Sequence, residues 1–257
     1  MVTISAVIIV KNEQELIKAC LESVRWVDEI IVVNDYSTDR TLEACKDYQK
    51  AKTFTRSMSE GFGPQKNYGL SKASGDWILS IDADEEVSEA LKTEMRRKID
   101  LDEYDGFLLR RRNYILGRWM DDYKAKNLRL FKRQKGTFTN SRVHETVQLR
   151  GRTGRLKEPL THRPKNYLAI ETAVRALDMY SSLMAQDMYE HGVRLRGLGV
   201  PFRLLVIPSW YFIKKATVHR SLNGGVRGLL LSLFSAVEYF LTYAKVWERQ
   251  HVDRNQD

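Results

Sequence analysis

The fold class is indicated by residues 76–86, which read DWILSIDADEE. Trp77–Ile81 is a short apolar run typical of a buried strand, and an Asp-Ala-Asp pair follows it directly. Towards the N-terminus, Ile4–Val10 and Glu29–Val33 are two further apolar runs. Polar residues and then apolar residues at helical spacing come after each of them. This alternation predicts an α/β fold with a mainly parallel sheet flanked by helices.

The predicted elements change in character after residue 103. Before it, Asn12 is expected to cap a helix that ends at Val24, and Ser88 to cap a helix that ends near Ile99. Further helices are predicted over residues 38–48 and 65–73. After it, the sequence predicts short strands at 106–110, 128–132 and 146–149, a helix at 167–189, and an apolar helical tail from residue 197.

Composition excludes several classes of protein. The 257 residues include 26 aromatic ones, which argues against disorder. Cys20 and Cys45 are the two cysteines, so a disulfide scaffold is excluded and a reducing compartment is expected. No basic segment precedes an apolar one at Met1, so we expect no signal peptide. The near-apolar stretch 228–243 is shorter than the roughly 20 residues that a membrane span needs.

The net charge of +9 is unevenly distributed along the chain. Residues 1–103 carry −6, residues 104–165 carry +12, residues 166–193 carry −3 and residues 194–257 carry +6. We therefore expect a catalytic domain over 1–165, with an acidic half at 1–103 and a basic half at 104–165, and a helical extension over 166–257. Nucleic acid, a membrane surface and a phosphorylated substrate are the anionic partners that this distribution allows.

Three predicted strand ends carry acids or amides: Lys11-Asn12-Glu13, Asn34-Asp35 and Asp82-Ala83-Asp84. Ligands of open α/β sheets bind outside the carboxyl ends of the strands. Two carboxylates at i and i+2 are able to place one group on a hard cation and the other on a ribose hydroxyl. Mg²⁺ and Mn²⁺ favour such carboxylate oxygens, although an Asp-x-Asp pair by itself is also common as a surface feature.

These segments resemble glycosyltransferase family 2. The resemblance rests on residues 7–13 (VIIVKNE), 29–39 (EIIVVNDYSTD) and 74–85 (SGDWILSIDADE). Residues 61–67 (GFGPQKN), 129–131 (RLF) and 143–145 (VHE) look like the branch that contains lipopolysaccharide core β-1,4-glucosyltransferases, and 217–228 is more loosely similar. The resemblance implies a GT-A fold, which is Rossmann-like, with a partly apolar helical extension at the C-terminus. It also implies a nucleotide diphosphate sugar as donor.

Site roles follow from the resemblance residue by residue. Asp82 would contact the ribose, and Asp84 the divalent metal, Mg²⁺ or Mn²⁺, that bridges the donor's two phosphates. Asn34 and Asp35 would lie by the uracil, with Lys66 near the base or phosphate. The branch usually has Asp where Asn34 stands, so the base contact passes to Asp35 or uses an amide. The donor site would also include Val10, Asn12, Glu13 and Ala83.

The catalytic base has rival candidates. Inverting transfer needs a carboxylate or imidazole within reach of the acceptor hydroxyl, and Glu145 is an isolated acid in the +12 segment. Glu145 would alternatively form a structural ion pair with a neighbouring arginine. Asp121 and Asp122 are the rival base, while His144 would assist the metal or a phosphate or else play a structural role. Cys20 and Cys45 are expected in the core.

The basic half and the tail point to an anionic, lipid-linked acceptor. An acceptor groove is predicted from its arginines and one tryptophan: Arg110, Arg112, Trp119, Arg129 and Arg142. A solvated basic surface is the alternative. No nucleic-acid-binding signature is present, so no nucleic-acid partner is expected. The tail predicts contact with a membrane surface, or else packing as core or on a second subunit.

The function expected from the sequence is a metal-dependent inverting hexosyltransferase, acting from a UDP-sugar on an anionic glycolipid such as the lipopolysaccharide inner core. Its location would be cytoplasmic and peripheral, on the inner face of the bacterial cytoplasmic membrane. The alternatives are a polyprenyl-phosphate glycosyltransferase, a nucleotidyltransferase, and a nucleic-acid- or lipid-binding protein. The oligomeric state is open.

Overall fold

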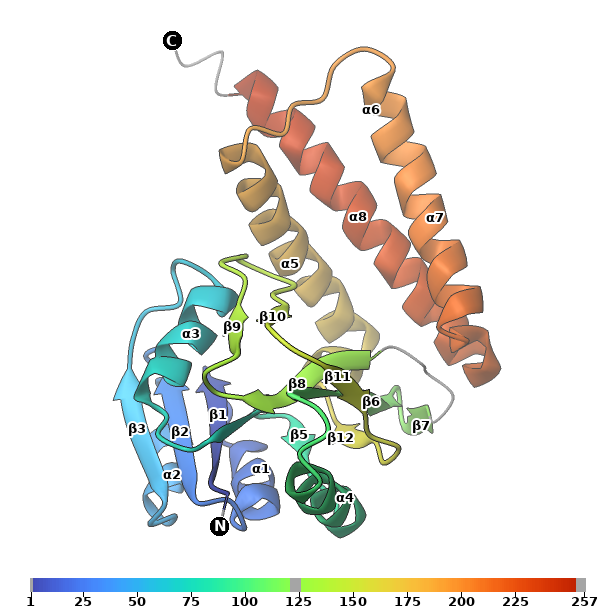
Figure 1. Ribbon diagram of the computed structural model, residues 1–257. Helices are drawn as coiled ribbons and strands as arrows, with labels where there is room; N and C mark the ends of the chain where they lie inside the picture. Colours follow the sequence, from blue (N-terminus) through green and yellow to red (C-terminus); the bar gives the residue numbers. More distant parts are fainter. Residues whose placement is uncertain (1, 121–125, 253–257) are drawn as a thin grey trace. The chain divides into compact units, whose positions relative to one another are not determined.

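The computed structural model describes residues 2–120 and 126–252. They fall into two compact units (Figure 1). The first comprises the described residues of 1–112 and 125–163, and the second those of 113–124 and 164–257. Residues 113–120 thus group with the C-terminal helices.

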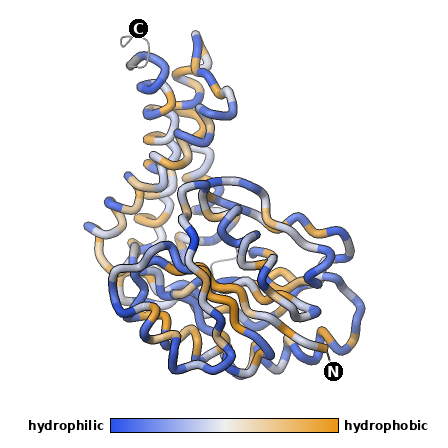
Figure 2. Tube along the Cα trace, turned by 90° about the vertical axis from the view of Figure 1, so that its left-hand side faces the viewer, coloured by the Kyte–Doolittle hydropathy of each residue, from blue (hydrophilic) through white to orange (hydrophobic). Residues whose placement is uncertain are grey.

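Four parallel strands form the core of the first unit in the order β3-β2-β1-β4. Their bounds are β1 Ile4–Val10, β2 Glu29–Asn34, β3 Ala51–Thr55 and β4 Trp77–Ser80. Successive residues of β1 enter opposite apolar clusters, with Ile8 in one and Val7 in the other. Both faces of this part of the sheet are therefore covered. Figure 2 shows hydrophobic residues concentrated along these strands.

Helices cover both faces of the parallel strands. On one face lie α1 (Ile17–Val24) and α4 (Glu89–Asp100), whose buried residues share a cluster with β1. Ala73, which ends α3 (Phe62–Lys72), belongs to the cluster on the other face. The short α2 (Thr41–Lys46) follows β2. Ser88 caps α4 as predicted, since its hydroxyl accepts the Leu91 N–H at 3.2 Å.

The sheet continues with antiparallel pairings beyond β4. β8 (Lys126–Lys132) pairs antiparallel with β4 and with β6 (Gly106–Ile115). β12 (Leu160–His162) pairs with the short β5 (Glu85–Glu86), and β11 (Thr153–Arg155) runs parallel to β6. β9 (Gly136–Phe138) and β10 (Val147–Leu149) form a separate hairpin.

The second unit is a helical bundle with a small hairpin. β7 (Arg118–Met120) pairs with the last residues of β6. The helices are α5 (Ile170–Glu190), α6 (Gly199–Pro201), α7 (Ile207–Ile213) and α8 (Val226–Val252). Met120 packs with Leu231 of α8, and the Arg227 Nε donates to the Leu116 carbonyl at 2.8 Å. Within the described chain, residues 226–251 form one helix long and apolar enough to cross a membrane.

The predicted fold class is confirmed, while one local prediction is wrong and one edge strand was not predicted. Asn12 does not cap a helix: it has φ 54°, and its Oδ1 accepts the Thr38 N–H at 2.8 Å instead. The first turn of α1 starts later, where the Glu13 carbonyl accepts the Leu16 and Ile17 N–H groups. The edge strand β3 was not predicted, because its residues are largely exposed and lack an apolar run.

Candidate functional site

The carboxyl ends of β1 and β2 are joined by reciprocal hydrogen bonds. The Val10 carbonyl accepts the Asp35 N–H at 2.8 Å, and Lys11 Nζ lies 2.7 Å from Asp35 Oδ2. The Ser37 hydroxyl accepts the Asn12 N–H at 2.9 Å. The Glu13 N–H donates to the Thr41 hydroxyl at 2.7 Å. These bonds fix the two loops against each other before any ligand arrives.

Asn34 and Asp35, which were expected to lie by the uracil, are buried at this edge. The Asn34 Oδ1 accepts the Ser37 N–H at 3.1 Å, and the Asp35 Oδ1 accepts the Met58 N–H at 3.1 Å. Between them and Ser37 stands Tyr36, which is 64% exposed and has φ 46°, a conformation that bulky residues rarely adopt. The two predicted residues thus shape the loop, and the Tyr36 ring is exposed on it.

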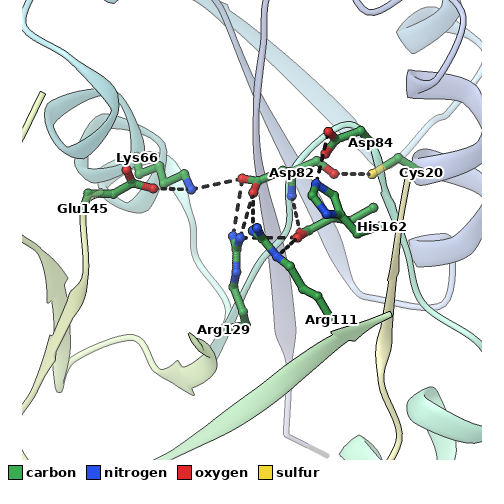
Figure 3. Close-up of polar contacts among 9 residues, drawn as sticks. Cys20, Lys66, Asp82, Asp84, Arg111, Arg129, Glu145 and His162 are labelled. Carbon is green, nitrogen blue, oxygen red and sulfur yellow. Dashed lines mark hydrogen bonds and ion pairs between the residues drawn. The ribbon is translucent and has the colours of Figure 1, made fainter. Parts of the chain in front are cut away.

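Asp82, at the end of β4, is held by three cationic side chains (Figure 3). Its Oδ1 lies 3.0 Å from Lys66 Nζ and 3.3 Å from Arg129 NH1. Its Oδ2 lies 2.7 Å from Arg129 NH2 and 2.8 Å from Arg111 NH2. Both oxygens are engaged, so the carboxylate has a fixed orientation. Arg129, predicted as an acceptor-binding residue, is buried and reaches this carboxylate from β8.

Glu85 lies under the same cations and is fully buried. Its Oε1 lies 2.5 Å from Arg111 Nε and 3.3 Å from Arg129 NH2, while its Oε2 accepts the Asp82 N–H at 2.9 Å. Burial raises the pKa of Glu85 to about 7, although Arg129 acts in the opposite direction. Burial also opposes ionisation of Asp82, but Arg129 and Lys66 hold the pKa of that carboxyl below its usual range.

Lys66 links Asp82 to Glu145, the predicted base. Its Nζ lies 3.0 Å from Asp82 Oδ1 and 2.6 Å from Glu145 Oε1 (Figure 3). Burial lowers the pKa of Lys66, but Asp82 and Glu145 outweigh it and raise the pKa above its usual value. The sequence separation between Lys66 and Glu145 is 79 residues. The ammonium therefore joins an expected donor-binding carboxylate to an expected acceptor-side carboxylate.

Two glycines allow this approach. A Cβ on Gly61, which has φ 105°, would lie 2.2 Å from the Arg142 Cα. A Cβ on Gly63 would lie 1.9 Å from the Thr139 carbonyl oxygen. Only a residue without a side chain lets the start of α3 contact segment 139–142 so closely. This contact places Lys66 of α3 next to Glu145.

Asp84 pairs with His162, which sequence reasoning did not identify. The His162 Nε2 lies 3.3 Å from Asp84 Oδ2, and β12 brings the ring there by pairing with β5. Burial lowers the pKa of His162, but Asp84 outweighs it, so the pKa is raised. One carboxylate and one imidazole fit Mn²⁺ or Mg²⁺ when substrate phosphates and water supply the remaining ligands. Among the described residues no group of three or more acidic, His or Cys side chains is arranged to hold a metal.

The other predicted residues lie farther from this centre or outside the described chain. Asp121 and Asp122 are outside the described residues. His144 is exposed with φ 56°, and Ala83 is buried between the two aspartates. The remaining predicted acceptor residues make other contacts: Arg110 donates to the Lys157 carbonyl, Arg142 donates to the Ser59 carbonyl, and Trp119 packs edge-on against Tyr114, while Arg112 is half-buried.

Arg111 and Glu85 are the other two residues that sequence reasoning missed. Arg111 stands between the two arginines assigned to the acceptor, and alternation along β6 places it on the opposite side from both. Applying this period of two to Arg110-Arg111-Arg112 would have separated it from its neighbours. Glu85 follows the Asp-Ala-Asp pair directly, so its acidic neighbours concealed its burial.

Taken together, these contacts join Lys66, Arg111 and Arg129 to the carboxylates of Asp82, Glu85 and Glu145. Asp84 and His162 offer ligands for a divalent cation, and Lys66 lies between Asp82 and Glu145. The Glu145 side chain is 14% exposed. This combination suits displacement of a charged phosphate leaving group by an alcohol.

The sequence matches the family described as glycosyl transferase family 2 over residues 5–156. It is 32% identical to the lipopolysaccharide core biosynthesis glycosyltransferase LpsC of Rhizobium meliloti, covering 96% of this chain and 92% of that protein. It is also 32% identical to an uncharacterized glycosyltransferase of Rickettsia felis, covering 95% of this chain and 89% of that protein.

Solved structures share the fold at lower identity. Mannosyltransferase PcManGT from Pyrobaculum calidifontis, in complex with GDP-Man and Mn²⁺, matches with a TM-score of 0.55 and 14% identity, covering 96% of this chain and 88% of that one. S. aureus TarS 1–349 in complex with UDP matches with a TM-score of 0.51 and 16% identity, covering 97% and 92%. The sequence match and the full-length relatives place this chain in one family: it belongs to glycosyl transferase family 2.

Proposed function

We propose that this family 2 glycosyltransferase moves a hexose from a UDP-sugar to an anionic glycolipid, such as the inner core of lipopolysaccharide, with inversion at the anomeric carbon. The observation that carries the proposal is the Asp82–Lys66–Glu145 chain of contacts beside the Asp84–His162 pair. Support for the acceptor class comes from the likeness to LpsC and from the +12 charge of residues 104–165. A polyprenyl phosphate is the alternative acceptor.

The donor nucleotide would bind across the carboxyl ends of β1, β2 and β4. The loops after β1 and β2 are already locked together, so their backbone groups need little rearrangement on binding. Asp82 is fixed by Arg111, Arg129 and Lys66. It would accept a hydrogen bond from a ribose hydroxyl once one of these cations moves away. The same cations would then lie next to the growing charge of the diphosphate.

Asp84 and His162 would hold the divalent cation, and His144 remains a predicted third ligand. The cation supplies charge stabilisation for the leaving diphosphate when it is bound. His162 would have to bind in its neutral form, because a protonated imidazole has no lone pair to donate. The pairing with Asp84 fixes the ring orientation that such binding requires.

Glu145 would remove the proton from the acceptor hydroxyl, which then attacks the anomeric carbon while UDP leaves. The Lys66 Nζ lies 2.6 Å from Glu145 Oε1 and fixes the position of this carboxylate. Asp121 and Asp122 remain the rival base. Arg110, Arg112, Trp119 and Arg142 would bind the acceptor's anionic and sugar groups.

We propose a cytoplasmic location, peripheral on the inner face of the bacterial cytoplasmic membrane. Two free, buried cysteines agree with a reducing compartment. The C-terminal helices would bring the enzyme to its lipid-linked acceptor. No nucleic-acid partner is proposed, and the nucleotidyltransferase alternative is dropped because the chain is a family 2 glycosyltransferase.

The test is release of UDP from a panel of UDP-sugars by the purified full-length chain, with Mn²⁺ and a heptose–Kdo–lipid A acceptor. We expect release that depends on the acceptor and stops with EDTA, and anomeric inversion by NMR of the product. The matched variants are Asp84→Ala, which removes a metal ligand, and Asp47→Ala, an acidic side chain beyond the end of α2. Asp84→Ala should abolish transfer with little loss of folding. Unchanged turnover by Asp84→Ala would exclude the metal assignment.

A further inference from the structure

The outward side of α8 carries an apolar stripe. Its large apolar members recur at intervals of three or four residues from Val226 to Phe240, with a further one two turns later, and each is between 40% and 71% exposed: Val226, Leu229, Leu233, Val237, Phe240 and Trp247. The spacing places them on one side of the helix. Isolated exposed apolar residues are ordinary, but a contiguous stripe of this length marks an interaction surface.

The preceding helical run, residues 199–218, carries a second stripe. It consists of α6, α7 and two segments with π-helical hydrogen bonding, Phe202–Val206 and Lys214–Val218. Its exposed apolar residues are again three or four positions apart, at Phe202, Leu205, Val206, Trp210 and Ile213, and are 50–62% exposed. The tyrosines at 211 and 239 stack with ring centroids 3.5 Å apart, so both helices keep these stripes away from their mutual contact.

The positive charge of this region favours an anionic partner. Between residues 191 and 237 the sequence has seven Lys and Arg residues and no Asp or Glu. Arg194, Arg196 and Arg220 are exposed. A second copy of the same surface would bring like charges together, whereas the headgroups of an anionic bilayer would neutralise them. Exposed tryptophans beside apolar residues are also typical of membrane interfaces.

The contacts of α8 with its neighbours oppose a transmembrane placement. Lys245 Nζ lies 2.7 Å from the Asp178 carboxylate of α5 and donates to the Ser181 and Ser182 hydroxyls at 2.8 Å. The Lys215 ammonium donates to the Ser235 hydroxyl, and Gln250 accepts the Leu195 N–H at 2.7 Å. These polar contacts would all have to break for α8 to enter the hydrocarbon core alone, where each freed group would be unsatisfied.

We infer that α7 and α8 lie in the plane of an anionic membrane, with their outward stripes among the acyl chains and the exposed Arg194, Arg196 and Arg220 at the headgroup phosphates. This inference rests on the proposed membrane location and adds the surface, the lipid charge and the depth. Helices α7 and α8 are thus an interfacial anchor, and α8 does not span the bilayer.

The test is co-sedimentation of the full-length protein with preformed vesicles, without donor or acceptor. We expect binding to vesicles of equal parts phosphatidylglycerol and phosphatidylcholine, much weaker binding to phosphatidylcholine alone, and release by high salt. The double substitution Leu233→Glu, Phe240→Glu should weaken binding by at least about tenfold, since each side chain is 42% exposed and burying that part is worth roughly a factor of three to ten. The control is Leu101→Glu, at an equally exposed apolar residue after α4, which should bind normally.

The alternatives give different results. Unchanged binding by the double variant would overturn the inference. A protein that forms dimers by sedimentation analysis, ignores vesicles, and becomes monomeric with the double substitution would assign the stripe to a second copy. Protein that stays with vesicles after an alkaline wash would indicate a spanning helix. Failure of UDP release with normal vesicle binding would contradict the proposed transfer reaction and leave this inference standing.

Discussion

Replacing Arg129 with Met should reveal how much the buried ion cluster contributes to stability. Arg129 is 6% exposed and binds both the Asp82 and the Glu85 carboxylates. Removing Arg129 leaves the two carboxylates to share Arg111 and Lys66, and the loss of one partner of a buried ion cluster costs about 3–5 kcal/mol. Because each kcal/mol shifts the melting temperature of a domain of this size by about 2–4 °C, the expected drop is roughly 6–20 °C.

The assay is thermal and urea unfolding followed by circular dichroism, with Arg110→Met as the matched control. Arg110 is on the same sheet and donates to the Lys157 carbonyl at 3.3 Å, so its replacement should cost no more than about 0.5 kcal/mol. Adding Glu85→Gln to Arg129→Met should restore part of the loss, because it removes one of the two carboxylates that have lost Arg129. A loss below about 1 kcal/mol for Arg129→Met, or no coupling in the double variant, would refute the reasoning.

Three further predictions concern single side chains. Glu145→Gln should lower turnover by about 10²–10⁴ with a nearly normal donor KM, and near-normal turnover in steady-state assays would transfer the role of base to Asp121 or Asp122. Tyr36→Gly should raise the free energy of unfolding by about 1 kcal/mol, since glycine adopts φ 46° without strain, and a lower urea midpoint would show that the exposed ring is needed for packing. Burial opposes ionisation of Glu29, but Lys52, Ser5 and Ser74 lower its pKa to about 2. The stability that Glu29 contributes is therefore complete above about pH 4.5 and is lost as the pH falls towards 2. Glu29→Gln should flatten this acid limb in urea unfolding, and an unchanged limb would refute the assignment.

The parallel half of the fold could be predicted because its strands are continuous apolar runs. Ile4–Val10 and Trp77–Ser80 are buried on both faces, and such strands need no alternation to be recognised. β3 lacked this signal because it lies at the edge of the sheet. Asn12 has a typical capping side chain, but tertiary contact with Thr38 outweighed that local preference.

The predicted strand ends indicated where some site residues lie, but not which contacts they make with the rest of the site. The position of Asp82 and Asp84 after an apolar strand was sufficient to place both carboxylates at the edge of the sheet. The contact between Lys66 and Glu145 depends on two glycines that let α3 approach segment 139–142. The hydrophobic periodicity of the sequence does not predict such a contact. His162 was missed because its role depends on the pairing of β12 with β5, two short strands without an apolar pattern.

The grouping of residues 113–120 with the C-terminal helices has a consequence for protein engineering. Ile115 and Met120 form a cluster with Leu231, and the Leu116 N–H donates to the Tyr167 carbonyl at 2.9 Å. A truncation after residue 165 would remove α8 and expose these apolar residues, so the shortened protein would carry an aggregation-prone hairpin. A soluble catalytic fragment therefore requires two cuts: removal of the tail, and replacement of the hairpin tip by a short polar turn.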